Sequence, residues 1–137
     1  MKRNVPVSSI MSTEPVTVHH GQKLSDVQTL MAERGFHHVP VVSGDRVVGM
    51  LTSTDVLRVS YQYGQDPRQA DAILDHTLSL EDVMTKDVSI IGAKESIRRA
   101  FEILAEGRFH ALPVVEDDVL VGIVTTTDLL NYALEQY

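Results

Sequence analysis

The feature that most limits the folds open to this chain of 137 residues is an internal repeat. Displacing the sequence by 73 residues aligns residues 7–60 with residues 80–133 without a gap, and 15 of the 54 aligned positions are identical. A repeat of this length is one supersecondary unit, which buries its apolar face against a neighbouring copy. We therefore expect two copies of one unit, at residues 7–60 and 80–133, joined by a linker at residues 61–79.

Each copy has the apolar periodicities of a β-α-β-β-α unit. The first helix of each copy is predicted by apolar residues at helical spacing, namely Leu24, Val27, Leu30 and Met31, then Ile97, Ala100, Ile103 and Leu104. The expected strands are residues 16–18, 39–42 and 46–51 in the first copy, and 88–91, 112–115 and 119–124 in the second. A second helix is expected to start at residues 54–55 and 127–128. The predicted fold class is α/β (α+β), with two pseudo-twofold-related units packed through their sheets.

Two prolines and the linker add local detail. Pro40 and Pro113 cannot donate to a sheet, so each is expected to open a strand or to lie on an edge. In the linker, Asp66 and Pro67 followed by Gln69 resemble the start of a helix, and a short linker helix is predicted.

Composition excludes several classes of protein. The chain has no cysteine, which rules out disulfides, thiolate metal sites and a thiol nucleophile. Residues 1–10 hold no apolar run long enough for a signal peptide, and no run of about 18 apolar residues occurs in the sequence, so we expect a soluble, cytoplasmic protein without membrane contact. The net charge of -7 and the scattered Lys and Arg residues argue against a nucleic-acid surface.

The segment from Gly49 to Asp55, repeated from Gly122 to Asp128, carries the chemical information. It joins the end of a strand to the first turn of a helix, where free N–H groups and the helix dipole attract phosphate. In extended geometry the hydroxyls of Thr52 and Thr54 point to the same side, toward such an anion. The carboxylate of Asp55 suits the paired hydroxyls of a ribose. The second copy supplies the counterparts Thr125, Thr127 and Asp128, and both glycines allow close backbone approach or a bulge.

A simpler interpretation is that these residues only cap a helix, because Thr, Ser and Asp are the commonest caps. Duplication favours binding, since a cap needs one such residue whereas both copies keep Gly, two Thr and Asp in one register.

The duplicated pattern Gly-x-x-Thr-x-x-Asp, after Phe-His-x-x-Pro-Val-Val, resembles a tandem pair of CBS (cystathionine β-synthase) domains over nearly the whole chain. The resemblance implies that Asp55 and Asp128 hold ribose and that Thr52, Thr54, Thr125 and Thr127 contact phosphate or ribose. It implies an adenine slot near Thr17 and Ile90 and around Phe36 and Phe109. In a related nucleotide-sensing kinase subunit, histidines at the positions of His37 and His110 contact phosphate.

Each of these aromatic and charged residues also has a structural interpretation. A histidine near an anion gains a proton more easily, but His37 and His110 are equally consistent with exposed residues at a strand entrance. Phe36 and Phe109 could pack against an adenine face, but an aromatic residue that follows a helix is more often part of the core. His19, His20 and His38 are not repeated, and adjacent residues of an extended segment face opposite ways, so no metal site is expected. Four arginines are candidates for reaching a phosphate, although solvated surface is the default for each: Arg34, Arg98, Arg99 and Arg108.

Such domain pairs usually associate further into dimers. An apolar stripe at the end of the chain is a candidate contact for a homodimer, or packs within its own repeat: Leu129, Leu130, Ala133, Leu134 and Tyr137.

The function predicted by these observations is a regulatory module that binds an adenosine ligand and signals to a separate, unknown effector protein. AMP, ADP and ATP are the leading ligands, with S-adenosylmethionine and NAD(H) open because they share adenosine. The alternative is a structural or interaction scaffold with empty clefts. An enzyme is not expected, because the sequence offers no nucleophile–base pair, Walker loop or metal cluster, and no catalytic cofactor is implied.

Overall fold

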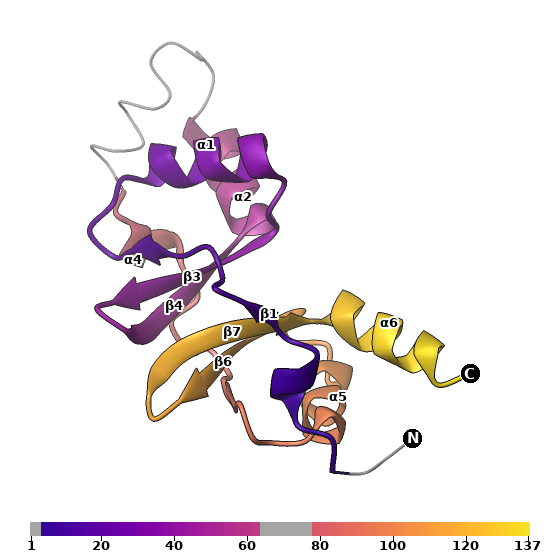
Figure 1. Ribbon diagram of the computed structural model, residues 1–137. Helices are drawn as coiled ribbons and strands as arrows, with labels where there is room; N and C mark the ends of the chain where they lie inside the picture. Colours follow the sequence, from indigo (N-terminus) through magenta and orange to yellow (C-terminus); the bar gives the residue numbers. More distant parts are fainter. Residues whose placement is uncertain (1–3, 64–77) are drawn as a thin grey trace. The chain divides into compact units, whose positions relative to one another are not determined.

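The computed structural model describes residues 4–63 and 78–137, which form two compact units. One unit comprises residues 16–87, and the other joins residues 1–15 to residues 88–137. Each unit contains one sheet and the helices that cover it (Figure 1). Within the described residues, no helix is both long and apolar enough to cross a membrane.

The unit of residues 16–87 is built on a three-stranded sheet of order β2-β3-β4. Strand β2 runs parallel to β3, and β3 forms an antiparallel hairpin with β4. Its core contains Leu24, Val39 and Leu51, all fully buried. The elements are β2 (Val18–His19), α1 (Leu24–Arg34), β3 (His38–Ser43), β4 (Arg46–Thr52), α2 (Ser53–Tyr63) and α4 (Leu80–Val83).

The second unit has a four-stranded sheet of order β1-β7-β6-β5, with β5 parallel to β6 and the other pairs antiparallel. Its core contains the fully buried Leu112, Val114 and Val124. The elements are the 3-10 helix η1 (Val7–Ser9), β1 (Ser12–Thr13), β5 (Ile91–Gly92), α5 (Ile97–Ala105), β6 (Ala111–Glu116), β7 (Val119–Thr125) and α6 (Thr126–Glu135).

The predicted order β-α-β-β-α is confirmed in both copies, with small differences at the boundaries. The first strands are shorter and later than predicted, at Val18–His19 and Ile91–Gly92. Helices α2 and α6 begin at Ser53 and Thr126, one residue before the predicted starts, because the threonine ahead of each serves as the cap. The predicted linker helix near Asp66, Pro67 and Gln69 lies outside the described residues.

Pro40 lies inside β3 and does not open it, which leaves the second alternative of the prediction, a position on an edge. Pro40 faces Met50 of β4, whose amide and carbonyl both bond to Thr85 instead. The nitrogen of Pro40 therefore points away from β4, toward the side where β2 pairs only with Val41 and Val42. The missing N–H group falls beyond the end of β2, which makes this position locally an edge.

Each unit contains the first segment of the other copy. We call residues 7–15 and 80–87 the leader segments. The first leader supplies β1, which pairs with β7 through Ser12–Ile123 and Thr13–Gly122 (Figure 1). The second leader packs on the first copy, where Met50 and Thr85 exchange two backbone hydrogen bonds, both 2.9 Å long. The two compact units are therefore assembled by an exchange of leaders, which the sequence analysis did not predict.

Gly49 and Gly122 explain how a leader approaches the strand so closely. A β-carbon on Gly49 would overlap the Met84 side chain and lie 3.0 Å from the Thr85 carbonyl oxygen. On Gly122 it would overlap Met11 and lie 2.8 Å from the Ser12 carbonyl oxygen. Both glycines also adjoin a shift in the hairpin register. The close approach and the bulge expected from these glycines are both present.

Gly49→Ala and Gly122→Ala are each expected to lower the free energy of unfolding by about 1–3 kcal/mol, because the added methyl group overpacks a leader contact. Urea denaturation followed by circular dichroism measures the change. Gly21→Ala is the matched control, since its β-carbon would meet only the His19 ring, at 3.5 Å from Nδ1 and 3.8 Å from Cε1, which are ordinary contacts. The packing argument fails if all three variants unfold at the same urea concentration.

The second leader begins with a capped turn. Both the backbone amide and the hydroxyl of Ser79 donate to Asp82 Oδ2, at 2.9 and 3.0 Å. These two bonds, followed by the nearby charge of Lys86, lower the pKa of Asp82 below its ordinary value of 3.8. The carboxylate form is therefore the one that stabilises the start of α4.

Titration of the Asp82 carboxyl by NMR should give a midpoint below 3.8. Because the folded-state pKa is depressed, the contribution of Asp82 to stability is present above the unfolded-state pKa. That contribution is lost as the pH falls through the folded-state pKa. Ser79→Ala removes the hydroxyl donor and should move the midpoint back toward 3.8, and an unchanged midpoint in this variant would contradict the assignment.

Candidate functional site

The junction of β4 and α2 holds the first copy of the duplicated motif. Thr52 ends the strand, and its hydroxyl oxygen accepts a hydrogen bond from the amide of Asp55 at 3.1 Å. In return, Asp55 Oδ2 accepts from the amide of Thr52 at 3.2 Å. This reciprocal pair is a capping box, which satisfies amides that a helix start otherwise leaves free.

The second copy repeats this arrangement at the junction of β7 and α6. Thr125 Oγ1 accepts from the amide of Asp128 at 3.1 Å, and Asp128 Oδ2 accepts from the amide of Thr125 at 2.8 Å. Both aspartates are half-buried, so the fold places a carboxylate at the same position of each unit.

The capping interpretation is therefore correct, and part of the binding geometry expected from the sequence is wrong. Thr54 and Thr127 lie in the first turn of a helix and not in an extended strand, so the argument that places Thr54 on the same side as Thr52 does not hold. Both residues are exposed, and their hydroxyls make no hydrogen bond within the described residues. They remain accessible at the helix N-terminus, where an anion is favoured.

The two aspartates differ in what surrounds their second oxygen. Asp55 Oδ1 lies 3.8 Å from a guanidinium nitrogen of Arg58, one turn further along α2. Asp128 Oδ1 has no hydrogen bond or ion pair within residues 4–63 and 78–137. Asp128 thus offers a free acceptor oxygen, and Asp55 offers one that already faces a cation.

His37 and His110 lie beside the motif of their own copy. The carbonyl of His37 accepts from the amide of Ser53, and that of His110 accepts from the amide of Thr126, both at 2.9 Å. His37 Nδ1 lies 3.5 Å from the hydroxyl of Ser53. Both histidines are exposed, and contact of either ring with a ligand stays a prediction.

The residues predicted to line the adenine slot have mixed surroundings. Phe36 and Phe109 are half-buried and pack against the cores of their units, as the structural interpretation holds. Thr17 is half-buried just before β2, and Ile90 is 46% exposed just before β5. Contact of these four residues with adenine stays a prediction.

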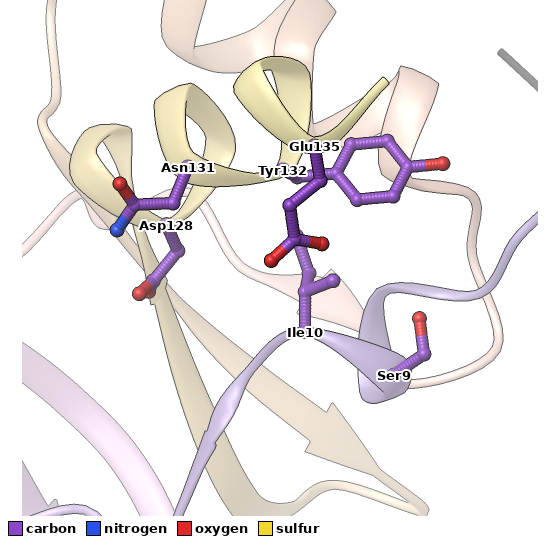
Figure 2. Close-up of a pocket in the computed structure, with 6 residues that line it drawn as sticks. All are labelled: Ser9, Ile10, Asp128, Asn131, Tyr132 and Glu135. Carbon is purple, nitrogen blue, oxygen red and sulfur yellow. The ribbon is translucent and has the colours of Figure 1, made fainter. Parts of the chain in front are cut away.

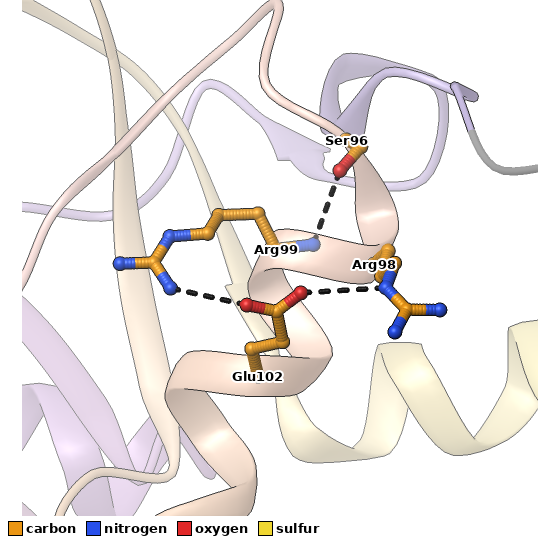
Figure 3. Close-up of polar contacts among 4 residues, drawn as sticks. All are labelled: Ser96, Arg98, Arg99 and Glu102. Atoms are coloured by element: carbon orange, nitrogen blue, oxygen red, sulfur yellow. Dashed lines mark hydrogen bonds and ion pairs between the residues drawn. The ribbon is translucent and has the colours of Figure 1, made fainter.

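Most of the candidate arginines are paired away from the motif. Arg98 and Arg99 both contact Glu102 within α5, at 3.4 and 3.3 Å (Figure 3). Arg108 pairs with Glu106 at 3.7 Å and stacks over the Phe109 ring. Arg34 is exposed in the last turn of α1.

The unrepeated histidines have local contacts. His19 Nδ1 accepts from the amide of Gly21 at 3.2 Å, and His20 Nδ1 lies 3.6 Å from Glu81. Among the described residues, no group of three or more His, Asp or Glu side chains is arranged to hold a metal ion.

A pocket of about 250 Å³ lies between the first leader and α6 (Figure 2). It is lined by Ser9, Ile10, Asp128, Asn131, Tyr132 and Glu135. Asp128 was predicted from the motif, whereas the other five residues and Arg58 were missed. A signal for two of them was present: Arg58 and Asn131 are aligned by the 73-residue offset but are not identical.

Only part of the apolar stripe at the end of the chain is buried. Leu129 is 3% exposed and belongs to the core, whereas Leu130 and Leu134 are 59% and 69% exposed. The stripe therefore packs only in part within its own repeat.

The fold and the site define a class: a duplicated α/β unit with a capped aspartate at the same helix start in each copy. The family model of the CBS domain matches this chain twice, at residues 7–61 and 80–135, and the chain belongs to the CBS-domain family.

Relatives extend beyond this chain in length. The uncharacterized protein MJ1225 of Methanocaldococcus jannaschii is 29% identical over 132 residues, which cover 94% of this chain and 47% of that protein. Its crystal structure, described as a proposed archaeal homologue of γ-AMPK, superposes with a TM-score of 0.78 and covers 97% of this chain and 49% of its own. The chain thus spans about half of this relative. Relatives named as homoserine O-acetyltransferases are matched over 23–24% of their length.

Two solved structures with bound ligands share the fold over the full module. The CBS domain pair of MJ0100, in complex with 5′-methylthioadenosine and S-adenosyl-L-methionine, has a TM-score of 0.80 at 22% identity, covering 97% of this chain and 98% of that one. CBSX2 in complex with AMP has a TM-score of 0.78 at 23% identity, covering 96% and 97%.

Proposed function

We propose that this chain is a regulatory module that binds an adenosine ligand, with AMP, ADP or ATP as the leading candidates, and signals to a separate partner protein in the cytoplasm. The observation that carries the proposal is the capping box repeated at α2 and α6. In each copy it fixes a carboxylate beside a helix N-terminus.

The chemistry of this junction suits a nucleoside with a polar group at one end. A carboxylate accepts the two hydroxyls of a ribose, for which Asp128 has a free oxygen. The exposed hydroxyls of Thr54 and Thr127 and the helix N-terminus are donors toward a phosphate. His37 and His110, at the same junctions, are further donors when protonated.

The comparisons support the ligand class. MJ0100 and CBSX2 share this fold and were solved in complex with 5′-methylthioadenosine and S-adenosyl-L-methionine, and with AMP. An adenosine portion is common to all three ligands, and its ribose is the part that the duplicated aspartates are proposed to bind.

A binding role without catalysis fits the relatives. The enzymes among them are longer proteins, in which the segment similar to this chain is about a quarter of the length.

We propose that the exposed Leu130 and Leu134 of α6 contact a second copy in a homodimer. The second candidate function, a scaffold without ligand, is favoured by the capping boxes alone, because they explain the duplicated residues through helix stability.

Adding an adenosine ligand is expected to raise the unfolding temperature of the full chain. Binding only the native state contributes about 2.7 kcal/mol at a ligand concentration 100 times the dissociation constant. Differential scanning fluorimetry and calorimetry with AMP, ADP, ATP, S-adenosylmethionine and NAD(H) test this. The scaffold function is supported instead if millimolar concentrations of all five produce neither heat nor a shift.

Asp55→Ala and Asp128→Ala are each expected to weaken binding at one site by about tenfold or more, because a hydrogen bond to a charged group is lost. Each variant also loses a helix cap, which costs about 1 kcal/mol of stability. Isothermal titration measures the affinity, and urea denaturation measures the stability.

Asp82→Ala is the matched control, because Asp82 accepts an amide at the start of α4 in the same way but lies outside the motif. It should lose similar stability and keep both sites. Equal affinities in all three variants and the parent chain would overturn the ribose assignment.

A further inference from the structure

The two copies of the motif are not chemically equivalent. The residue three positions after the aspartate is Arg58 in the first copy and Asn131 in the second, although the offset aligns them. Arg58 approaches Asp55 at 3.8 Å and leaves this end of α2 with one positive charge to offset the carboxylate. Asn131 brings no charge to Asp128, and Glu135 adds a second negative one, on the side chain that lines the same pocket.

The pocket beside Asp128 has one sign of charge. Asp128, Asn131, Tyr132 and Glu135 come from one face of α6, and no Lys or Arg is among the lining residues. In Figure 2 the carboxylate of Glu135 points from α6 toward Ile10 of the leader. Among the residues that line the pocket, a phosphate meets two carboxylates and neither Lys nor Arg, whereas a neutral or positively charged group meets favourable acceptors.

The size of the pocket shows how much of a ligand it accommodates. Its volume of about 250 Å³ is below the range of about 300–1,000 Å³ that is typical of whole small-molecule sites. Asn131 is about 4.5 Å and Glu135 about 10.5 Å along the helix axis from Asp128, at a rise of 1.5 Å per residue. A nucleoside whose ribose is held by Asp128 therefore extends one of its ends along these two side chains.

From these observations we propose that the two sites select adenosine ligands by charge. The Asp128 site takes an adenosine whose group beyond the ribose is neutral or cationic, as in a thioether or sulfonium nucleoside. The Asp55 site takes a phosphate-bearing one, with Arg58 as its specificity-determining cation. This inference rests on the proposed function and assigns a ligand class to each of its two sites.

The test isolates one site at a time in the full chain. Asp55→Ala leaves the Asp128 site, and titration calorimetry there compares AMP, 5′-methylthioadenosine and S-adenosylmethionine. We expect AMP to bind most weakly of the three. Adding Asn131→Arg should improve AMP relative to S-adenosylmethionine by about tenfold, and adding Glu135→Gln by about threefold, because each change lowers the negative charge at the pocket.

Gln136→Arg is the control, because it adds the same charge to the C-terminal end of α6 at an exposed residue that does not line the pocket. It should change the ratio of the two affinities by less than about twofold. In the complementary Asp128→Ala background, Arg58→Asn should weaken AMP about tenfold and leave 5′-methylthioadenosine nearly unchanged.

The outcomes separate the two proposals. Binding of none of the three ligands to the parent chain would overturn the proposed function, and the charge selection with it. Binding that persists with the same ratio of affinities in Asn131→Arg, Glu135→Gln and Gln136→Arg would overturn the charge selection alone. Thermal unfolding of each variant confirms that the compared chains are folded.

Discussion

The contact between each leader segment and a bare glycine α-carbon is the constraint on which both units depend. Gly49 and Gly122 lie where any side chain would overlap a leader methionine and approach a leader carbonyl. At this distance the backbone of Thr85 bonds to Met50, and that of the first leader pairs with β7. The strand that ends in the motif is thus fixed on both sides, by its hairpin partner and by the leader. The position of the helix start that follows this strand is fixed as a result.

The aspartate of each motif stabilises the helix start and remains available for chemistry. One oxygen of Asp128 accepts the amide of Thr125, which holds the side chain in a single orientation. The other oxygen is then directed outward without further cost in conformational freedom. The capping box therefore orients a carboxylate, and in the proposed binding role the cap and the ligand use two different oxygens of this one group.

Local patterns made much of the fold predictable. The hairpins follow from strand periodicity and from turn residues such as Gly44, Asp117 and Asp118, all of which have positive φ in the structure. The observed helices start one residue before the predicted positions. The prediction treated Thr52 and Thr54 as extended residues, whereas Thr52 and Asp55 form a capping box and the helix begins between them. The exchange of leaders was not predictable, since both leaders carry a similar pattern around Met11 and Met84, and that pattern does not say which copy each leader packs against. Because the sequence is a repeat, it does not indicate which copy each leader segment packs against. The pocket on α6 was missed because comparing the copies for identity overlooks the positions where they diverge.

Arg58 and Asn131 are divergent positions that folding leaves free. Gly49 makes room for the leader, and Thr52 and Asp55 form the capping box. The residues at the corresponding positions of the second copy are identical. Arg58 and Asn131 lie one turn further on, exposed, and neither belongs to a core cluster or a cap. A change there costs the fold little but alters the charge next to the oriented carboxylate. Duplication of such a unit therefore gives two helix starts with one geometry, and the selectivity proposed for them depends on residues that this geometry does not constrain.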